Sequence, residues 1–484
     1  MKILHISAEC YPAAKAGGLG DVVGALPKYL NQAGTSTAVV IPKYHTRWIL
    51  SQEFTIVYRG RFQLYQQEIP FHIELLTNDS LGFPLYVANI PGKFDRPGVY
   101  ADDNGYAYGD EVERAIAFQK AVLEWVMQMP EKPELLHCHD HHTGLVPFLV
   151  KHCYDYQLLA NIPTVFTIHN GEYHGSFFWN KMGALPAFDG FAGGLLEWNG
   201  VINPLASAIK CCWKLTTVSQ SYMEELRQSS NGLEGLLRAE IGKSTGILNG
   251  IDLQVWNPAT DHYLDHRLEG DRIDEYKRAN KLQLCDRFGL NPDLPLFTFI
   301  GRLVGEKGAD LLPGAISRFL QYGHQASFIV LGTGQAYLHD AFNEMRYRFS
   351  SHFNASLEYN EGLAHQLYAG ADFLLMPSRV EPCGLNQLYA LRYGTVPVVR
   401  SVGGLRDTIT DMDQANGSGI RFSYLTVDDT SWAIFRATEL YGDFNRFKWL
   451  RNQGMGLDYS WEKSAATYQA IYQSLQEKAE VESI

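Results

Sequence analysis

Residues 377–389 have the sequence Pro-Ser-Arg-Val-Glu-Pro-Cys-Gly-Leu-Asn-Gln-Leu-Tyr, and this stretch decides the fold class. The apolar run before it, residues 371–376, indicates a buried strand, and residues 388–391 begin a helical pattern. One carboxylate, Glu381, therefore lies on a loop between the carboxyl end of a strand and the N-terminus of a helix. Parallel α/β sheets bind ligands at this edge, where the free N–H groups of the helix favour anions.

A second strand, loop and helix stand at the N-terminus. The strand pattern covers residues 2–7, the helical pattern covers residues 25–30, and the loop between them contains Lys15, Gly17 and Gly18. The glycines let backbone N–H groups approach a phosphate, and the lysine adds a positive charge. A simple tight turn would also explain such a loop, so the loop alone does not establish a phosphate site.

Strand patterns alternate with helical patterns along the chain, which is typical of parallel sheets. The expected strands are residues 2–7, 37–41, 85–90, 135–138, 163–168 and 214–218, followed by 296–301, 327–331, 355–359, 373–376 and 397–400. The expected helices include residues 109–129, 219–228 and 274–288. We therefore expect an α/β protein with two Rossmann-like domains, residues 1–255 and 256–455, and a final helix within residues 456–484.

Composition limits the possible functions. The 484 residues carry a formal net charge of −12, which argues against a general nucleic-acid-binding protein. The seven cysteines are odd in number and form no Cys-x-x-Cys pair, so we expect no disulfide framework and a reducing cytoplasm. We find no signal-peptide pattern and no run of 18 apolar residues, so we expect no membrane span.

Two groups of polar residues are candidates for chemistry. Arg302 and Lys307 follow the strand pattern at residues 296–301, where two cations would suit a departing diphosphate; a solvated basic loop is the alternative. Residues 136–142, Leu-His-Cys-His-Asp-His-His, suggest a metal site at first. His137 and His139 would share one face of a strand, however, and the sequence shows no second cluster to complete such a site.

These motifs resemble the bacterial glycogen synthases and plant starch synthases, which form glycosyltransferase family five. The resemblance covers nearly the whole chain. The matching segments are residues 15–21, 166–170, 246–252, 256–260, 301–308, 377–389 and 459–462. It implies a GT-B fold, in which two Rossmann-like domains face each other across a cleft and a C-terminal helix crosses back to the first domain.

The resemblance also implies roles for individual residues. Arg302, Lys307 and Lys15 would stabilise the diphosphate, Glu381 and His169 would hold the glucose, and Asp140 would act on the acceptor or sugar side. Further expected contacts with the donor come from Gly17, Gly18, Asn249, Tyr359, Cys383, Gly384, Leu385, Gly403 and Gly404. Tyr359 would lie against the nucleotide base, and Cys383 would line the pocket without acting as a nucleophile, since the sequence offers it no base.

Three positions bear on how far the resemblance extends. Gln335 stands where many relatives have an acidic residue, and residues 203–206 read Asn-Pro-Leu-Ala where relatives usually have Asn-Phe-Leu-Lys. Acceptor contacts in that region are therefore not carried over. Tyr389 stands where many other two-domain transferases have a second glutamate, and its presence matches this family.

The resemblance implies transfer of glucose from ADP-glucose to the non-reducing 4-hydroxyl of an α-1,4-glucan, with retention of configuration. UDP-glucose remains possible as the donor. We expect no metal, no other cofactor and no nucleic-acid partner, and the sequence leaves the oligomeric state open. Another glucosyltransferase of the sucrose or trehalose type, or a catalytically silent glucan-binding protein, are the alternatives. A dehydrogenase is disfavoured because the loop at Lys15 lacks Gly-x-Gly-x-x-Gly spacing.

Overall fold

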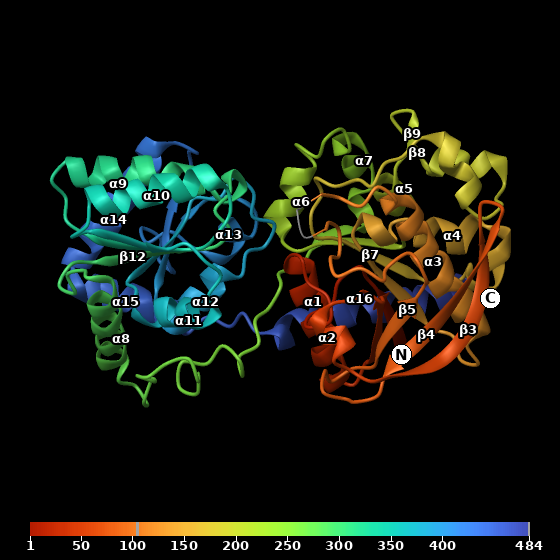
Figure 1. Ribbon diagram of the computed structural model, residues 1–484, viewed down its shortest axis with the longest axis horizontal. Helices are drawn as coiled ribbons and strands as arrows, with labels where there is room; N and C mark the ends of the chain where they lie inside the picture. Colours follow the sequence, from red (N-terminus) through yellow and green to blue (C-terminus); the bar gives the residue numbers. More distant parts are fainter. Residues whose placement is uncertain (103–105, 483–484) are drawn as a thin grey trace. The chain divides into compact units, whose positions relative to one another are not determined.

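The computed structural model describes residues 1–102 and 106–482 (Figure 1). The chain forms two compact units. The first contains residues 1–218, 223–247 and 461–484, and the second contains residues 219–222 and 248–460. Residues 483 and 484, which the predicted final helix included, lie outside the described residues. None of the described helices is long and apolar enough to cross a membrane.

The first unit is built on a nine-stranded sheet with the order β11-β10-β7-β6-β1-β2-β5-β4-β3. Its strands are β1 (Lys2–Ile6), β2 (Ser36–Pro42), β3 (Phe54–Leu64), β4 (Gln67–Leu76), β5 (Leu85–Asn89), β6 (Leu135–His139), β7 (Thr164–Ile168), β10 (Lys214–Thr217) and β11 (Ser244–Gly246). The strands from β11 to β5 pair in parallel, whereas β3 and β4 form an antiparallel hairpin at one edge.

The C-terminal helix completes the first unit. Helix α16 (Trp461–Glu482) contacts α1 (Gly18–Gln32), and Figure 1 shows this blue helix among the N-terminal elements. Its side chains Trp461, Tyr468 and Tyr472 are buried in one apolar cluster with residues of α1 and β1. Burying such large aromatic surfaces is strongly favourable, so α16 is an integral part of this unit rather than an appendage.

The second unit contains a six-stranded parallel sheet with the order β14-β13-β12-β15-β16-β17. The strands are β12 (Leu296–Ile300), β13 (Ser327–Leu331), β14 (Phe353–Ser356), β15 (Phe373–Met376), β16 (Val396–Arg400) and β17 (Ile420–Phe422). Helices α9 (Leu312–Gln321), α10 (Ala336–Arg348) and α14 (Val427–Gly442) cover one face (Figure 1). Helices α8 (Ile273–Phe288), α11 (Glu361–Gly370) and α12 (Asn386–Tyr393) cover the other.

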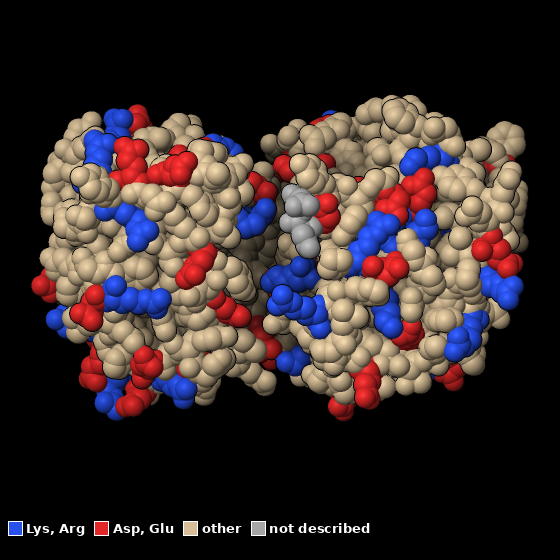
Figure 2. All heavy atoms as spheres, in the orientation of Figure 1, with Lys and Arg blue, Asp and Glu red and all other residues tan. Residues whose placement is uncertain are grey.

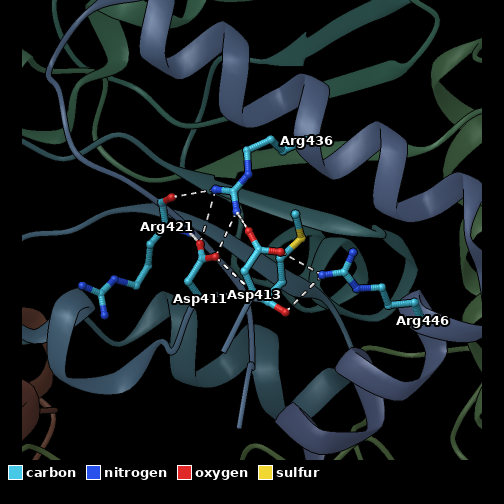
Figure 3. Close-up of polar contacts among 6 residues, drawn as sticks. Asp411, Asp413, Arg421, Arg436 and Arg446 are labelled. Carbon is cyan, nitrogen blue, oxygen red and sulfur yellow. Dashed lines mark hydrogen bonds and ion pairs between the residues drawn. The ribbon is translucent and has the colours of Figure 1, made fainter. Parts of the chain in front are cut away.

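A network of ion pairs ties the end of the second sheet to its helices (Figure 3). Arg436 on α14 binds Asp411 at 2.9 Å and Asp413 at 2.8 Å, and it also donates to the Arg421 carbonyl at 3.0 Å. Arg446 on α15 (Phe444–Met455) binds Asp413 at 2.9 Å.

The surface charge is mixed in sign. On the face drawn in Figure 2, acidic and basic side chains are interspersed on both units. The negative net charge is therefore not gathered into one patch on that face.

Every predicted strand forms within one or two residues of its expected range, except for β14, whereas the parallel edge strands β11 and β17 were not predicted. Strand β14 covers Phe353–Ser356 rather than residues 355–359, because its register with β13 pairs Phe353 with Phe328.

The boundary between the two units also differs from the predicted boundary between residues 255 and 256. Residues 248–255 belong to the second unit, where the Ile251 N–H donates to the Tyr459 carbonyl at 2.9 Å. The hairpin of β3 and β4 was not predicted.

Candidate active site

The strand order of the second sheet brings two of the predicted loops together. Strands β12 and β15 are neighbours, and the strands that follow them, β13 and β16, lie on opposite sides of this pair. The loops that leave β12 and β15 therefore diverge and open a crevice at the carboxyl ends of the strands, where doubly wound sheets bind ligands. The first loop carries Arg302 and Lys307, and the second carries Glu381.

Glu381 and Lys307 form a two-pronged ion pair. Each carboxylate oxygen of Glu381 lies 2.8 Å from Nζ of Lys307, and the Ser378 hydroxyl donates to Oε2 at 3.0 Å. Glu381 is only 6% exposed. The buried carboxylate therefore holds Lys307 in place, so that its ammonium group lies at the crevice.

Arg302 is placed differently from Lys307. Its side chain is 64% exposed, and its guanidinium lies 3.5 Å from the Glu306 carboxylate. A cavity of about 190 Å³ is lined by Gly301, Lys307, Glu381, Leu385 and Asn386 among other described residues, and Arg302 is not one of them. The structure therefore gathers Lys307, Glu381 and Leu385 around one cavity, and it adds Asn386, which the sequence did not single out. The amide of Asn386 donates to the Ile300 carbonyl at 2.7 Å and ties the start of α12 to the end of β12.

The glycines at 403 and 404 support the Glu381 loop. Gly403 begins α13 (Gly403–Thr408) with a φ of 46°, and a Cβ there would lie 2.1 Å from the Glu381 carbonyl oxygen. A Cβ on Gly404 would lie 2.1 Å from the Cys383 carbonyl oxygen. Both positions thus require glycine for close backbone packing. Any contact that they make with a phosphate remains a prediction.

Cys383 and Asn249 are buried close to each other behind the loop. Burial raises the pKa of the Cys383 thiol to about 12, although a hydrogen bond from the Asn249 backbone opposes the shift. The thiol is therefore protonated at neutral pH and unsuited to nucleophilic attack. The Oδ1 atom of Asn249 is buried without a hydrogen-bond partner among the described residues.

Gly384 and Tyr359 differ in burial and packing. Gly384 is in the left-handed region with a φ of 72°, and a Cβ there would lie 2.6 Å from the Gln387 side chain. Tyr359 follows β14 and is 83% exposed. The contact of Tyr359 with a nucleotide base stays a prediction.

The first sheet has the same arrangement of strands. Strand β1 lies between β2 and β6, so the loops that leave β1 and β6 diverge at their carboxyl ends. These loops carry the glycine segment with Lys15 and the residue Asp140, and His169 follows the next strand, β7. Three predicted residues of the first unit therefore lie at one edge of its sheet.

The glycine loop is held by an acidic residue that the sequence analysis missed. Glu9 Oε2 accepts from the N–H groups of Ala16 at 2.6 Å and Gly17 at 2.9 Å, and Tyr100 donates to Oε1 at 2.6 Å. Lys15 is paired with Asp21 at 2.7 Å. Gly17 and Gly18 have open space where a Cβ would stand. Glu9 lies in the loop that leaves β1, shortly after Ile6, and this position after a strand is the signal that could have identified it.

Asp140 shapes the loop at His169. Its Oδ1 accepts from the backbone N–H of His169 at 2.7 Å and of Asn170 at 3.3 Å. Burial raises the pKa of its carboxyl to about 6 despite these hydrogen bonds. Its φ of 56° is uncommon for a residue with a side chain, so the loop stores backbone strain here.

The histidines near Asp140 separate into two groups in the structure. His137 and His139 lie inside the sheet with His5 of β1, whereas His141 and His142 lie near Glu111 at 3.7 Å and 4.0 Å. In the inner group five of the six ring nitrogens are hydrogen bonded. The contacts join His5 to His139, His139 to His169, and His137 to Tyr472 and Thr167. The sequence analysis did not anticipate His5 or Glu111.

Comparison with known proteins identifies the family. Residues 2–239 match the model of the starch synthase catalytic domain, and residues 283–438 match that of group 1 glycosyl transferases. The chain is 46% identical over 473 residues to a glycogen synthase of Flavobacterium johnsoniae, covering 98% of each chain. The chain belongs to the glycogen and starch synthase family. As a member of this family, it is a hexosyltransferase.

Other relatives agree with this assignment. A glycogen synthase of Streptococcus agalactiae is 37% identical over 491 residues, covering 98% of this chain and 100% of the relative. The catalytic domain of starch synthase IV from Arabidopsis thaliana, solved with ADP and acarbose, superimposes with a TM-score of 0.86 at 31% identity, covering 98% and 99% of the two chains. A sucrose-phosphate synthase from Thermosynechococcus elongatus, with a TM-score of 0.63 at 16% identity and 98% of both chains covered, shares the fold alone. These likenesses confirm the GT-B fold.

Proposed function

We propose that this family member transfers glucose from ADP-glucose to the non-reducing 4-hydroxyl of an α-1,4-glucan, with retention of configuration. The observation that carries the proposal is the ion pair of Glu381 and Lys307 at the switch point of the second sheet, where Arg302 lies on the same loop as Lys307. The family membership indicates a nucleotide-glucose donor. The ADP in the Arabidopsis relative favours ADP over other nucleotides, and the acarbose in it supports a glucan acceptor.

The donor side must stabilise the negative charge that develops as the diphosphate leaves. Lys307 is already fixed by two hydrogen bonds to Glu381, so it can bind a phosphate oxygen without first losing much side-chain freedom. Arg302 is exposed, and Glu306 at 3.5 Å is its one ion-pair partner within residues 1–102 and 106–482, so we propose that it turns toward the diphosphate when the donor binds. We also assign Lys15 to the diphosphate.

We propose that the sugar is bound through hydrogen bonds. We assign Glu381 and His169 to the glucose and Tyr359 to the base. Asp140 holds the backbone of His169, so its effect on the sugar would come through the position of that loop. This differs from a direct proton transfer, which would need the Asp140 oxygens at the reacting atoms.

We propose that the reaction needs no metal ion. Two cations on one loop supply the charge that a metal would otherwise give to the diphosphate. In the inner histidine group, a metal would have to displace existing hydrogen bonds, since only Nε2 of His5 lacks a partner among the described residues.

An assay of donor and acceptor tests the proposal. Purified protein is incubated with glycogen and either ADP-glucose or UDP-glucose, and nucleotide release and glucan extension are both measured. We expect glucan-dependent release, faster with ADP-glucose. Release that depends on a small sugar acceptor instead of glucan would favour a sucrose or trehalose type of transferase. Glucan binding without any release would favour a silent glucan-binding protein.

A further inference from the structure

Three buried imidazoles form a continuous hydrogen-bonded chain in the first unit. Nδ1 of His5 lies 3.0 Å from Nε2 of His139, and Nδ1 of His139 lies 3.0 Å from Nε2 of His169. These residues come from β1, the end of β6 and the position after β7, which are adjacent strands. His5 and His139 are fully buried, and His169 keeps 8% of its surface exposed. The chain thus runs from the sheet interior to the edge at Asp140.

The three rings carry a fixed number of protons. Burial lowers the pKa of His5 and His169 to about 3 and holds that of His139 well below its usual value, so all three rings are neutral at pH 7. Each neutral imidazole has one ring proton. Two of the three protons lie in the two N···N hydrogen bonds. The third must be at one end of the chain, on Nε2 of His5 or on Nδ1 of His169.

The two ends differ in their surroundings. Nε2 of His5 is buried and has no hydrogen-bond partner among the described residues. A buried N–H without an acceptor is rarer and costlier than a buried acceptor without a donor. The third proton therefore belongs at the other end, on Nδ1 of His169, and all three rings are then Nδ1–H tautomers. The opposite alignment would make all three Nε2–H tautomers.

We propose that His5 and His139 are positioning residues that fix His169 as an Nδ1–H tautomer, so that it presents a neutral hydrogen-bond donor to an oxygen of the sugar. The proposal rests on the assignment of His169 to the glucose. Because Nε2 of His169 is bound to His139, Nδ1 is the ring nitrogen left for a ligand. His169 then recognises an oxygen lone pair and contributes orientation, whereas the positive charge comes from Lys307 and Arg302.

Nuclear magnetic resonance of the protein with ¹⁵N-labelled histidine rings tests the tautomers directly. Two-bond ¹⁵N–¹H spectra separate Nδ1–H from Nε2–H rings, and the spectra of H5L, H139L and H169Q assign the three signals by subtraction. We expect Nδ1–H at His5, His139 and His169 in the ligand-free protein. Nε2–H at all three, or a charged ring at pH 7, would overturn the proposal. This readout needs no activity, so it stands even where the proposed transfer is not observed.

Kinetics of two variants at one position test the positioning role. His139→Leu removes the partner of His169, whereas His139→Asn keeps an amide N–H close to the position of Nδ1. We expect kcat/KM for ADP-glucose to fall about tenfold or more in H139L and to recover to within about threefold in H139N. Binding of ADP, measured by calorimetry, should be unchanged in both because the predicted nucleotide contacts lie mainly in the second unit. Equal activity of H139L and the unchanged protein would overturn the positioning role.

Discussion

Glu381 orients Lys307 and is also proposed to bind the glucose. Replacing it with alanine leaves Lys307 without its two oxygen partners and removes the proposed sugar contact. We expect Glu381→Ala to lower kcat at least about a hundredfold, or about 2.7 kcal/mol of transition-state stabilisation. Steady-state kinetics with saturating ADP-glucose and glycogen measure this.

Cys383→Ser is the matched control on the same loop. The thiol is buried and protonated, and it takes no chemical step, so we expect kcat to stay within about fivefold of the unchanged protein. Near-normal turnover of folded Glu381→Ala would remove Glu381 from the site. A loss in C383S as deep as the loss in Glu381→Ala would point to a covalent role for the cysteine.

The raised pKa of Asp140 should make stability depend on pH. Its carboxyl has a pKa of about 6 in the folded protein, against about 3.9 in the unfolded chain. The folded state therefore binds the proton more tightly. The stabilisation is fully present below pH about 4 and is lost as the pH rises through about 6.

Asp140→Asn removes this titration and keeps an oxygen to accept from the His169 N–H. Between pH 4 and 7.5, the free energy of unfolding of the unchanged protein should fall relative to D140N by on the order of 2–3 kcal/mol. Urea unfolding of both proteins at the two pH values gives the difference between their free energies of unfolding. The contributions of the other titrating groups are the same in both proteins and cancel in this difference. A difference that does not change with pH would contradict a pKa of Asp140 that burial raises in the folded protein.

Whether a site residue can be predicted from the sequence depends on how far apart in the sequence the contacting residues are. Lys307, Glu381 and Leu385 lie next to strand ends with clear apolar patterns, and the structure gathers them around one cavity. Glu9 follows a strand and His5 lies within one, but the imidazole that His5 contacts and the Tyr100 hydroxyl that donates to Glu9 are distant in sequence. No local pattern shows that a carboxylate binds loop amides or that an imidazole meets another 134 residues away.

At the scale of elements, close backbone packing sets the position of the Glu381 loop. Gly403→Ala would place a methyl group 2.1 Å from the Glu381 carbonyl oxygen at a residue with a φ of 46°. The helix or the loop must then move, and we expect a loss of about 2 kcal/mol in stability together with lower kcat. Urea unfolding and kinetics measure the two effects.

Gly442→Ala at the end of α14 is the matched control, because a Cβ there has open space. We expect it to change stability by less than about 0.5 kcal/mol and to leave kcat unchanged. If G403A were as stable and active as G442A, the tight contact between α13 and the Glu381 loop would not hold in solution.

The elements that the sequence predicts well are those buried on both faces. Strands β13 and β15 match their predicted ranges because continuous apolar runs identify them. The hairpin of β3 and β4 was missed because much of β3 is exposed. In addition, its turn passes through Tyr65 with a φ of 55° and lacks the glycine or asparagine that usually marks such turns.

At the scale of the whole molecule, the first unit depends on the end of the chain. Truncation after Ser460 removes Trp461, Tyr468 and Tyr472 from its core, together with the hydroxyl that contacts His137 at 2.7 Å. We expect hydrogen exchange to show loss of protection in β1 and α1, whereas β12 in the second unit stays protected. Truncation after Glu477 keeps these core residues and should leave protection unchanged. Equal protection of β1 in both truncations would show that α16 is dispensable.

The proposed independence from metal ions is tested on the whole protein. Two cations on the second unit are proposed to serve the diphosphate, and most ring nitrogens of the inner histidine group are already hydrogen bonded. We expect extensive dialysis against a chelator to leave full activity, and elemental analysis to find less than one equivalent of zinc. Activity that disappears with the chelator and returns with a metal ion would contradict this.

The return of α16 to the first unit has a consequence for biosynthesis. The ribosome makes residues 1–247 first, yet the surface of β1 and α1 that Tyr468 and Tyr472 cover stays open until Trp461–Glu482 have been made. Every residue of the second unit is made before that helix. The second unit can therefore finish folding on the nascent chain while the first still exposes apolar surface to chaperones. The domain that is synthesised first is the last to be completed.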